Sequence, residues 1–373
     1  MIPSDQRSPI LLLGNVLGLG GTEGQFAEVT CRLDRSRWDL HVSCVRAEGP
    51  LRAKLDAAGV HAWSCGRGSF KSPRFAVAVL NLASFLRAHR IRLVHSFDFY
   101  SNMLGVPAAR LARVPVMIAS QRDLGNLRPR LQRRLHNVVL RLADYVVVNA
   151  ETVAESIGKA GIVAPNRIVV IPSGVDGTRF SGTPGAARPS GRIIIGTLAV
   201  LRPEKGLVDF VRAAGDVVER FPEARFLIWG EGPLRAQLER LVRDLGLSGA
   251  VSIAGATLQP EAALTQLDIF VLPSLSEACS NALLEAMATG RAVVATRVGG
   301  NPALVEDQVT GLLVPPGDPA ALAKAVIRLI EEPALAARLA ARAQERARVE
   351  FGIDRMLSRL QALYDNALAK RGL

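Results

Sequence analysis

The sequence predicts an α/β protein built from two doubly wound domains, each with a mainly parallel sheet. Short apolar segments typical of buried strands alternate with longer segments of helical periodicity along the 373 residues. The segment 181–191, SGTPGAARPSG, is rich in Gly, Pro, Ser and Ala, and the alternation begins again after it. Because a chain of 373 residues can bury two cores, we expect domains at 1–182 and 183–352, followed by the C-terminal segment 353–373.

The first half opens with an apolar strand, Ile10–Leu13, and a Gly-rich loop, Gly14–Gly24, before a helix that begins near Gln25. Such a loop lets backbone amides approach a phosphate. Its spacing is not G-x-G-x-x-G, so a dinucleotide site is not indicated, and a plain turn is the alternative. Further helices are expected at 51–58, 75–89 and 127–142, and further strands at 40–45, 91–96, 114–125 (with a polar exit), 145–150 and 167–175.

The second half is expected to repeat this alternation, starting with a strand at 192–197 and another that ends in the turn FLIWGEGP, Phe226–Pro233. A buried strand is predicted at Ile269–Leu272, where Pro273 stops it. Ser280 or Asn281 then caps a helix that Gly290 closes. Beyond that, the Ala/Arg-rich sequence predicts helix from Pro333 to about Glu350, and a last helix at Ile353–Ala369.

Composition excludes several protein classes. No run of 18 apolar residues is present and Met1–Pro9 has no signal-peptide pattern, so we expect a cytoplasmic protein. The four cysteines and five histidines show no metal-ligand spacing, and the cysteines are expected to be free thiols. A pI near 10.4 would suit nucleic-acid binding. With only 5% aromatic residues and no basic groove interleaved with aromatics, that partner is not expected.

The positive charge is concentrated in the first half. Residues 1–185 hold 24 basic and 13 acidic side chains, whereas the remainder holds 22 and 21. This asymmetry favours an anionic partner, either a membrane surface or an acidic acceptor.

Within segment 122–141 and just beyond it, apolar and basic residues interleave at helical spacing. The apolar members are Leu127, Leu131, Leu135, Val138 and Leu142; the basic ones are Arg128, Arg130, Arg133, Arg134 and Arg141. The ordinary interpretation is a surface helix whose apolar stripe packs on its own sheet. The functional one, compatible with it, is a basic face docked on anionic lipid at the inner face of the plasma membrane.

Two carboxylates and two cations mark a candidate site in the second half. Glu277 lies on the loop after the 269–272 strand, and Glu285 lies within the following helix. The amides of Cys279, Ser280 and Asn281 fall where a helix N-terminus attracts an anion. Together these features suit a phosphorylated, hydroxyl-rich ligand. An ordinary strand–loop–helix with solvated glutamates is the alternative.

Arg202 and Lys205 follow another strand, three positions apart. They supply two positive charges, Arg by its planar fork and Lys as a point charge, that suit an anionic ligand.

These pieces resemble one family, the retaining glycosyltransferases of family 4. The resemblance lies in Glu-x7-Glu (Glu277, Glu285), Arg-x-x-Lys (Arg202, Lys205), GEGP, and VGGNP followed by TGLLVPPGDPAALA. It covers essentially the whole chain and is densest from about Ile171. It implies the GT-B fold, in which two Rossmann-like domains flank an interdomain cleft and the final helix, within 353–373, packs back on the first domain.

The resemblance also implies roles for individual residues. Glu277 would contact hydroxyls of the transferred sugar, Glu285 the ribose, and Arg202 with Lys205 the diphosphate. The donor would be lined by the amides of Cys279, Ser280 and Asn281, by the Gly230–Gly232 turn with Glu231 and Gly232, and by Gly255 near the base. Its diphosphate would lie near Gly20 and Gly21. Possible contacts to acceptor or sugar are His95 and Arg122.

At three positions the sequence either allows a second interpretation or departs from the family's pattern. A buried, satisfied histidine is an equal interpretation of His95. Ser120–Asp123 stand where family members commonly have a histidine, and Ala303 stands where many carry Glu.

The expected reaction is sugar transfer with retention from a nucleotide-diphosphate sugar, UDP- or GDP-linked, to a glycan or lipid-linked acceptor. No Asp-x-Asp motif stands in a suitable loop, so neither a metal nor another cofactor is expected. A two-step mechanism with Glu277 as nucleophile is chemically possible. A sugar-nucleotide epimerase and a non-catalytic binding protein are the competing functions.

Overall fold

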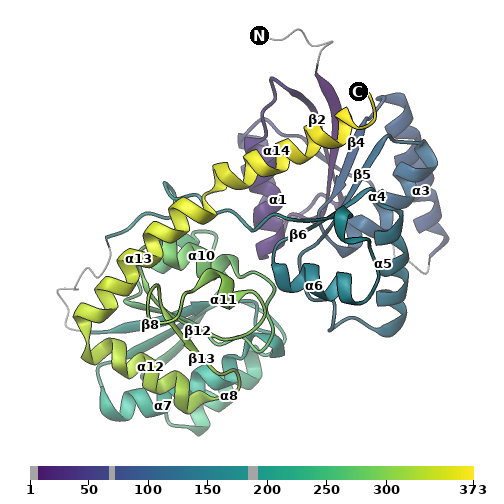
Figure 1. The fold of residues 1–373 in the computed structure, drawn as a ribbon. Coiled ribbons are helices and arrows are strands. Elements are labelled where there is room, and N and C mark those ends of the chain that lie inside the picture. Colours follow the sequence, from purple (N-terminus) through teal and green to yellow (C-terminus); the bar gives the residue numbers. More distant parts are fainter. Residues whose placement is uncertain (1–6, 67–71, 184–191) are drawn as a thin grey trace. The chain divides into compact units, whose positions relative to one another are not determined.

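The computed structural model describes residues 7–66, 72–183 and 192–373, which form two compact units. Unit 1 comprises Met1–Pro172 and Met356–Leu373, and unit 2 comprises Ser173–Arg355 (Figure 1). The Gly/Pro-rich segment expected to join the domains lies mostly outside the described residues, because only 181–183 of it are described. Residues 173–182, expected in the first domain, group with unit 2.

Unit 1 contains a seven-stranded parallel sheet with the order β3-β2-β1-β4-β5-β6-β7. The strands are mostly short runs of buried aliphatic residues, as parallel strands covered on both faces require. Their bounds are β1 Ser8–Val16, β2 Trp38–Arg46, β3 Ala62–Ser64, β4 Leu93–Ser96, β5 Val116–Gln121, β6 Tyr145–Val148 and β7 Ile168–Val170.

Helices cover both faces of this sheet. They are α1 Gly21–Arg32, α2 Arg52–Ala57, α3 Pro73–Ala88, α4 Phe99–Ala112, α5 Arg130–Leu142 and α6 Glu151–Lys159, with α14 Ile353–Ala369 from the end of the chain. Figure 1 shows α1 and α14 on one side of the strands and α3, α4 and α5 on the other, as right-handed crossovers require when the chain reverses its direction across the sheet. Tyr364 of α14 is fully buried against His95 and Trp38.

Unit 2 contains a six-stranded parallel sheet with the order β10-β9-β8-β11-β12-β13. The strands are β8 Ile194–Leu198, β9 Arg225–Trp229, β10 Val251–Gly255, β11 Ile269–Leu272, β12 Ala292–Thr296 and β13 Leu312–Val314. The helices are α7 Leu207–Arg220, α8 Arg235–Asp244, α9 Pro260–Thr265, α10 Asn281–Ala288, α11 Asn301–Leu304, α12 Pro319–Glu331 and α13 Pro333–Phe351.

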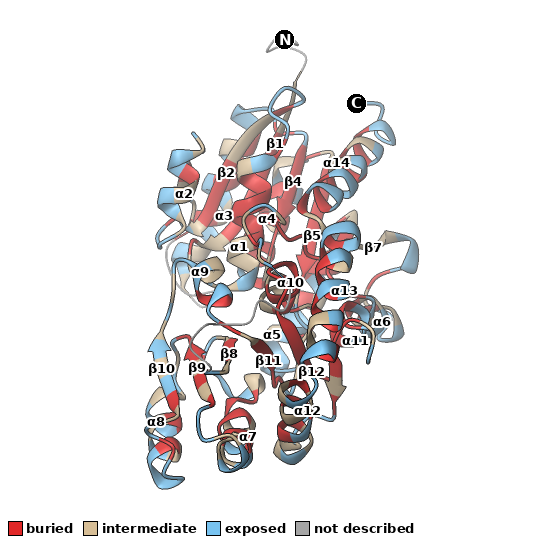
Figure 2. Ribbon diagram, turned by 90° about the vertical axis from the view of Figure 1, so that its left-hand side faces the viewer, coloured by how far each residue is buried: buried red, intermediate tan, exposed pale blue. Residues whose placement is uncertain are grey.

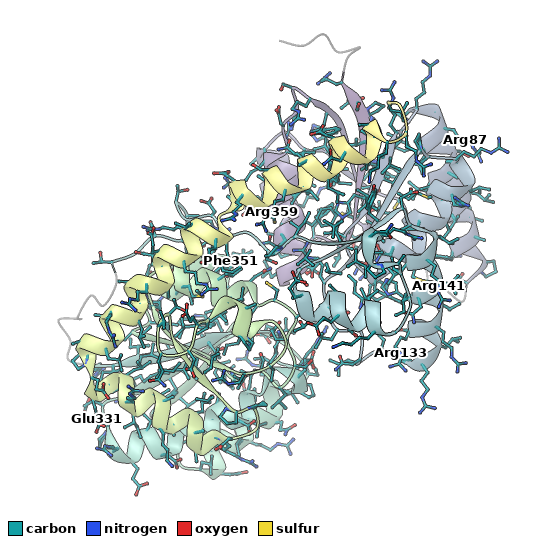
Figure 3. All side chains as sticks on the ribbon, viewed as in Figure 1. Arg87, Arg133, Arg141, Glu331, Phe351 and Arg359 are labelled. Carbon is teal, nitrogen blue, oxygen red and sulfur yellow. The ribbon has the colours of Figure 1, made fainter. Side chains whose placement is uncertain are left out.

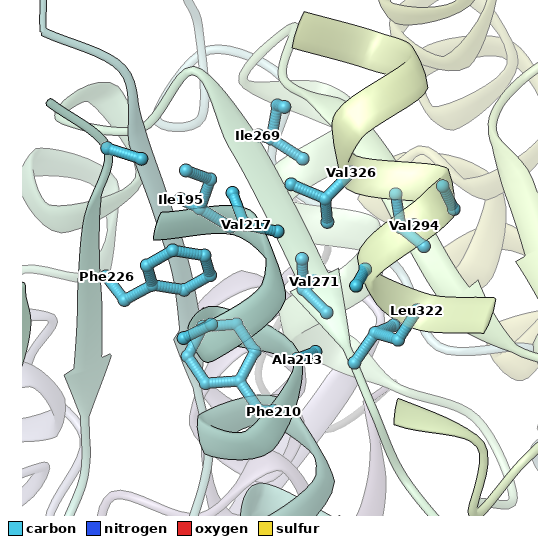
Figure 4. Packing of buried hydrophobic residues seen from close by; sticks show 14 of the residues in the cluster. Ile195, Phe210, Ala213, Val217, Phe226, Ile269, Val271, Val294, Leu322 and Val326 are labelled. Atoms are coloured by element: carbon cyan, nitrogen blue, oxygen red, sulfur yellow. The ribbon is translucent and has the colours of Figure 1, made fainter. Parts of the chain in front are cut away.

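Each face of the second sheet buries its own apolar cluster. On one face the rings of Phe210 and Phe226 meet edge to face at 5.4 Å, beside Val271, Val294 and Leu322 from the neighbouring strands and α12 (Figure 4). The other face buries a second cluster, beneath α10 and α13. Figure 2 shows the same distribution over both units, with buried strands and helices exposed on their outer sides. The sheets are therefore rigid supports for the loops at their strand ends.

Two sequence-based expectations need correction. Helix α1 begins at Gly21 rather than near Gln25, because Gly20 takes an extended conformation and ends the loop there. The apolar row of α5, expected to pack on its own sheet, is exposed: Leu131 keeps 63% of its surface. The sheet side of α5 is occupied by His136, Val139 and Leu140, which fix the helix in that rotation.

Candidate functional site

The predicted donor residues of unit 2 lie at the carboxyl ends of its strands. From β8 the chain continues to β9 and β10 on one side, whereas β11, β12 and β13 lie on the other. The order of strands therefore reverses between β8 and β11. In open parallel sheets, ligands bind at such a switch point, beyond the carboxyl ends of the strands.

A salt bridge spans this switch point. Lys205, after β8, places its Nζ 2.7 Å from Oε2 of Glu277, after β11. The two side chains are 24% and 11% exposed, so the pair is shielded but reachable. The Ser274 hydroxyl donates to the same Oε2 at 3.1 Å. The structure thus brings together a cation and a carboxylate that are 72 residues apart in sequence.

The backbone around this pair is held by close contacts that require glycine. Gly206 has φ +63°, and a Cβ there would lie 1.9 Å from the Pro273 carbonyl oxygen. Gly299 has φ +50°, and a Cβ there would lie 1.5 Å from the carbonyl oxygen of Glu277. The Leu275 amide donates to the Glu204 carbonyl at 2.8 Å. The β8, β11 and β12 loops are therefore fastened to one another around Lys205 and Glu277.

Arg202 belongs to a second set of joined strand ends. The amide of the preceding Leu201 donates to the Glu231 carbonyl at 2.9 Å, and the Gly230 amide donates to the Gly255 carbonyl at 2.7 Å. This pairing brings the turn containing Glu231 and Gly232 together with Gly255. The Glu231 carboxylate is paired with Arg235 at 2.8 Å. Arg202 itself is exposed and forms no salt bridge within the described residues.

The start of α10 refines the predicted anion-binding amides. Ser280 is the N-cap, and its hydroxyl accepts the Leu283 amide at 3.3 Å, so that hydroxyl serves the helix. Cys279 precedes the cap, and Asn281 is the first helical residue. Glu285 lies one turn further on and is half-buried, whereas its neighbours Leu284 and Ala286 are buried.

Gly20 and Gly21 begin α1 in unit 1. Gly20 is its N-cap and Gly21 is exposed, in the loop after β1. A Cβ at Gly20 would lie 2.2 Å from Oε2 of Glu23.

The structure matches the alternative interpretation of His95. Its Nδ1 lies 2.6 Å from the Tyr364 hydroxyl and its Nε2 lies 2.8 Å from the Ser120 hydroxyl, with only 1% of the residue exposed. Burial, and then the charge of Arg122, lower the pKa of His95 to about 3, so the ring is neutral. It is a buried, satisfied histidine. Arg122 lies half-buried just after β5, and its carbonyl accepts the Asn149 side-chain amide at 3.5 Å.

Asp98 and Ser274 are not among the residues predicted from sequence. Asp98 caps α4 by accepting the amides of Tyr100 at 2.7 Å and Ser101 at 3.0 Å. Burial, together with nearby Glu23, raises its pKa to about 6. It lies at the switch point of unit 1, after β4, where β1 and β4 are neighbours. The signal for Asp98 was the strand-end pattern D-x-x-S, and for Ser274 its place directly after Pro273.

Within residues 7–66, 72–183 and 192–373, no group of three or more His, Cys, Asp or Glu side chains could hold a metal ion. No helix among these residues is long and apolar enough to cross a membrane.

Two family models match this chain. The model described as "Glycosyl transferases group 1" matches residues 192–332, and the model described as "Glycosyl transferase 4-like domain" matches residues 20–174.

Several curated relatives are similar over most of both chains. A D-inositol 3-phosphate glycosyltransferase from Nocardiopsis dassonvillei is 31% identical, covering 75% of this chain and 72% of the relative. A counterpart from Corynebacterium urealyticum is 30% identical, covering 77% of each. The 2-deoxystreptamine glucosyltransferase of Streptomyces kanamyceticus is 29% identical, covering 73% of this chain and 76% of that protein.

Two solved structures share the fold. Anabaena HepE in complex with UDP-glucose has a TM-score of 0.85 at 20% identity, covering 96% of this chain and 99% of that one. Sucrose-phosphate synthase from Thermosynechococcus elongatus has a TM-score of 0.83 at 20% identity, covering 98% and 100%.

Proposed function

This chain belongs to the glycosyltransferases, as a sugar-nucleotide-dependent enzyme of the GT-B fold; from that premise we propose that unit 2 binds the nucleotide-diphosphate sugar at its strand ends and that unit 1 binds the acceptor. The observation that carries the donor assignment is the Lys205–Glu277 salt bridge across the switch point of the second sheet. Lys205 suits the diphosphate, and Glu277 suits the sugar.

Lys205 retains capacity for an anion. An ammonium group has three N–H donors, and Lys205 directs one of them to Glu277. The other two can reach diphosphate oxygens, and the exposed guanidinium of Arg202 adds a planar pair of donors. As the bond from the sugar to the diphosphate breaks, negative charge grows on the leaving oxygen, and fixed cations stabilise it. We expect no metal ion to be required.

Glu277 is suited to hold sugar hydroxyls. Its Oε2 accepts from Lys205 and Ser274, and Oε1 has no partner within the described residues. Because this carboxylate is assigned to the sugar hydroxyls rather than to attack on the anomeric carbon, the two-step mechanism is disfavoured. Glu285 is proposed to hold the ribose hydroxyls, and the turn with Glu231, Gly232 and Gly255 to line the nucleotide.

We propose retention of anomeric configuration. The acceptor oxygen bonds to the anomeric carbon on the face from which the phosphate leaves. The departing phosphate oxygen takes the acceptor proton. The products are a glycoside and a nucleoside diphosphate, so atoms and charge balance without an added base.

The proposed acceptor is a hydroxyl of a glycan or lipid-linked molecule. Support comes from the 24 basic against 13 acidic residues in the first 185, which favour an acidic acceptor or an anionic membrane on which the enzyme would be peripheral. A soluble cyclitol is a second candidate, because relatives are named for D-inositol 3-phosphate and 2-deoxystreptamine.

A donor screen followed by product analysis tests this proposal. Thermal shifts are measured with UDP-, GDP- and ADP-sugars, since a ligand at a hundred times its Kd adds ~2.7 kcal/mol to the free energy of unfolding. With the donor found, lipid-linked and cyclitol acceptors are compared, and NMR of the product gives the anomeric configuration. Inversion would refute the retaining mechanism, and no shift with any donor would refute the donor site.

A further inference from the structure

Helix α5 carries an exposed apolar row. The row comprises Leu127, just before the helix, and Leu131, Leu135, Val138 and Leu142, each between 40% and 66% exposed. At 3.6 residues per turn the four helical members lie within about 60° of one another around the axis. Single exposed leucines are common, but a contiguous row on one helix marks an interaction surface.

Three arginines, Arg130, Arg134 and Arg141, lie on one flank of this row, about 70–110° from its centre around the helix axis, whereas Arg133 lies on the opposite side. Arg130, Arg133, Arg134 and Arg141 are all exposed, and none of the four forms a salt bridge within the described residues. The third side of α5 faces the protein and is fixed there: His136 lies 3.0 Å from the Asn102 amide nitrogen and stacks edge to face on Phe99. The apolar row therefore cannot turn inward without breaking these contacts.

The surrounding surface continues the same character. Helices α3, α4 and α5 carry seven arginines and no acidic residue, and residues 73–143 hold twelve arginines against two aspartates. Arg87, Arg133 and Arg141 extend outward from this side of unit 1 (Figure 3). Further exposed apolar side chains are Val77 and Leu80 on α3 and Leu111 on α4.

We propose that α5 lies in the headgroup layer of an anionic bilayer, with the apolar row inserted among acyl chains and with Arg130, Arg134 and Arg141 bound to lipid phosphates. An interfacial helix needs this arrangement, an apolar face edged by basic residues. Anionic lipid complements the arginines, whereas a second copy of this chain would place arginine against arginine. The inference deepens the proposed function, because it identifies the surface that would bring the enzyme to a lipid-linked acceptor.

Vesicle co-sedimentation of the full chain tests this. Vesicles of phosphatidylcholine alone are compared with vesicles containing about one third phosphatidylglycerol. The first variant is Leu131→Ser/Leu135→Ser/Val138→Ser, and the second is Arg130→Gln/Arg134→Gln/Arg141→Gln. The matched control, Leu245→Ser/Leu258→Ser/Val349→Ser, removes three apolar side chains of unit 2 that are 46–64% exposed.

Wild type should bind only the anionic vesicles. Each α5 variant should lower the partition coefficient at least tenfold, and the control should remain within about twofold of wild type. Wild type that ignores anionic vesicles, or a serine variant that binds them as wild type does, overturns the proposal. So does a wild-type dimer in size-exclusion chromatography that the serine variant dissociates, since the row would then bind a second copy.

Donor thermal shifts on the same preparations separate this inference from the proposed function. A chain that binds vesicles but shows no thermal shift with any nucleotide sugar would support the membrane-binding role of α5 and refute the donor site. A chain that shows the shift but ignores vesicles would refute the α5 surface alone. The arginine variant, altered only at exposed positions, tests the proposal even if the serine variant fails to fold.

Discussion

Replacing Lys205 with Met should lower kcat by a factor between about one hundred and one thousand. This range corresponds to the ~2.7–4 kcal/mol lost when one preorganised donor to a developing anion is removed. Met keeps the length and apolar stem of the side chain. The Glu277 carboxylate, 11% exposed, would keep the Ser274 hydroxyl as its partner. Because the pair is neither fully buried nor fully exposed, its loss should cost about 1–2 kcal/mol of stability, between the values for surface and buried pairs.

Steady-state release of nucleoside diphosphate measures the effect, with a thermal melt to confirm folding. Lys159→Met is the matched control, because Lys159 pairs with Glu155 at 2.8 Å, but the two side chains are 78% and 61% exposed. That control should leave kcat unchanged. Combining Lys205→Met with Glu277→Gln should cost less than the sum of the single changes, since the residues act as a pair. A Lys205→Met enzyme with kcat within about threefold of wild type would refute the role assigned to Lys205.

Three further predictions follow from other contacts. Gly299→Ala should lower kcat at least tenfold, because its Cβ would lie 1.5 Å from the Glu277 carbonyl oxygen. Gly317→Ala, also at positive φ but in open space, should leave kcat unchanged. Equal effects of the two changes on kcat would show that backbone strain alone matters. Glu285→Ala should weaken nucleoside-diphosphate binding at least tenfold by calorimetry, and unchanged affinity would remove the ribose assignment. The raised pKa of Asp98, about 6, means that the folded state binds more protons than the unfolded state between pH 4 and 6. The contribution of Asp98 to the free energy of unfolding is therefore complete below about pH 4 and is lost as the pH rises through 6. Asp98→Asn, which can still accept the Tyr100 amide, should thus raise the urea midpoint at pH 8 and leave it unchanged at pH 4; an equal effect at both pH values would contradict this.

Local sequence signals predicted the elements whose ends are set by their own residues. Strand β11, Ile269–Leu272, and helix α14, Ile353–Ala369, have the bounds expected from sequence. Ser280 caps α10, and Gly290 follows its end at φ +72°. In each of these a proline, a cap or a glycine acts within a few residues, so no distant contact is needed to place the boundary.

Features that depend on residues far away in the sequence could not be predicted from local signals. The periodicity of α5 showed an apolar side but not what it faces, because His136 and its contacts with Asn102 and Phe99 decide the rotation of the helix. From the sequence alone, ligand contact and burial were equal interpretations of His95. The contact of its Nδ1 with the hydroxyl of Tyr364, 269 residues away, could not be predicted locally.

The candidate site was indicated by motifs, but its central contact was not. The motifs placed Lys205 and Glu277 each after a strand. Their 2.7 Å contact depends on β8 and β11 being neighbours, which is a property of sheet order rather than of local sequence.

A crystal structure of the chain with its nucleotide-diphosphate sugar tests most directly whether the second sheet's switch point is the donor site. We expect diphosphate oxygens within about 3 Å of Lys205 Nζ and the Arg202 guanidinium, with the sugar on Glu277. A donor bound away from the carboxyl ends of β8 and β11, with the Lys205–Glu277 pair untouched, would contradict this expectation.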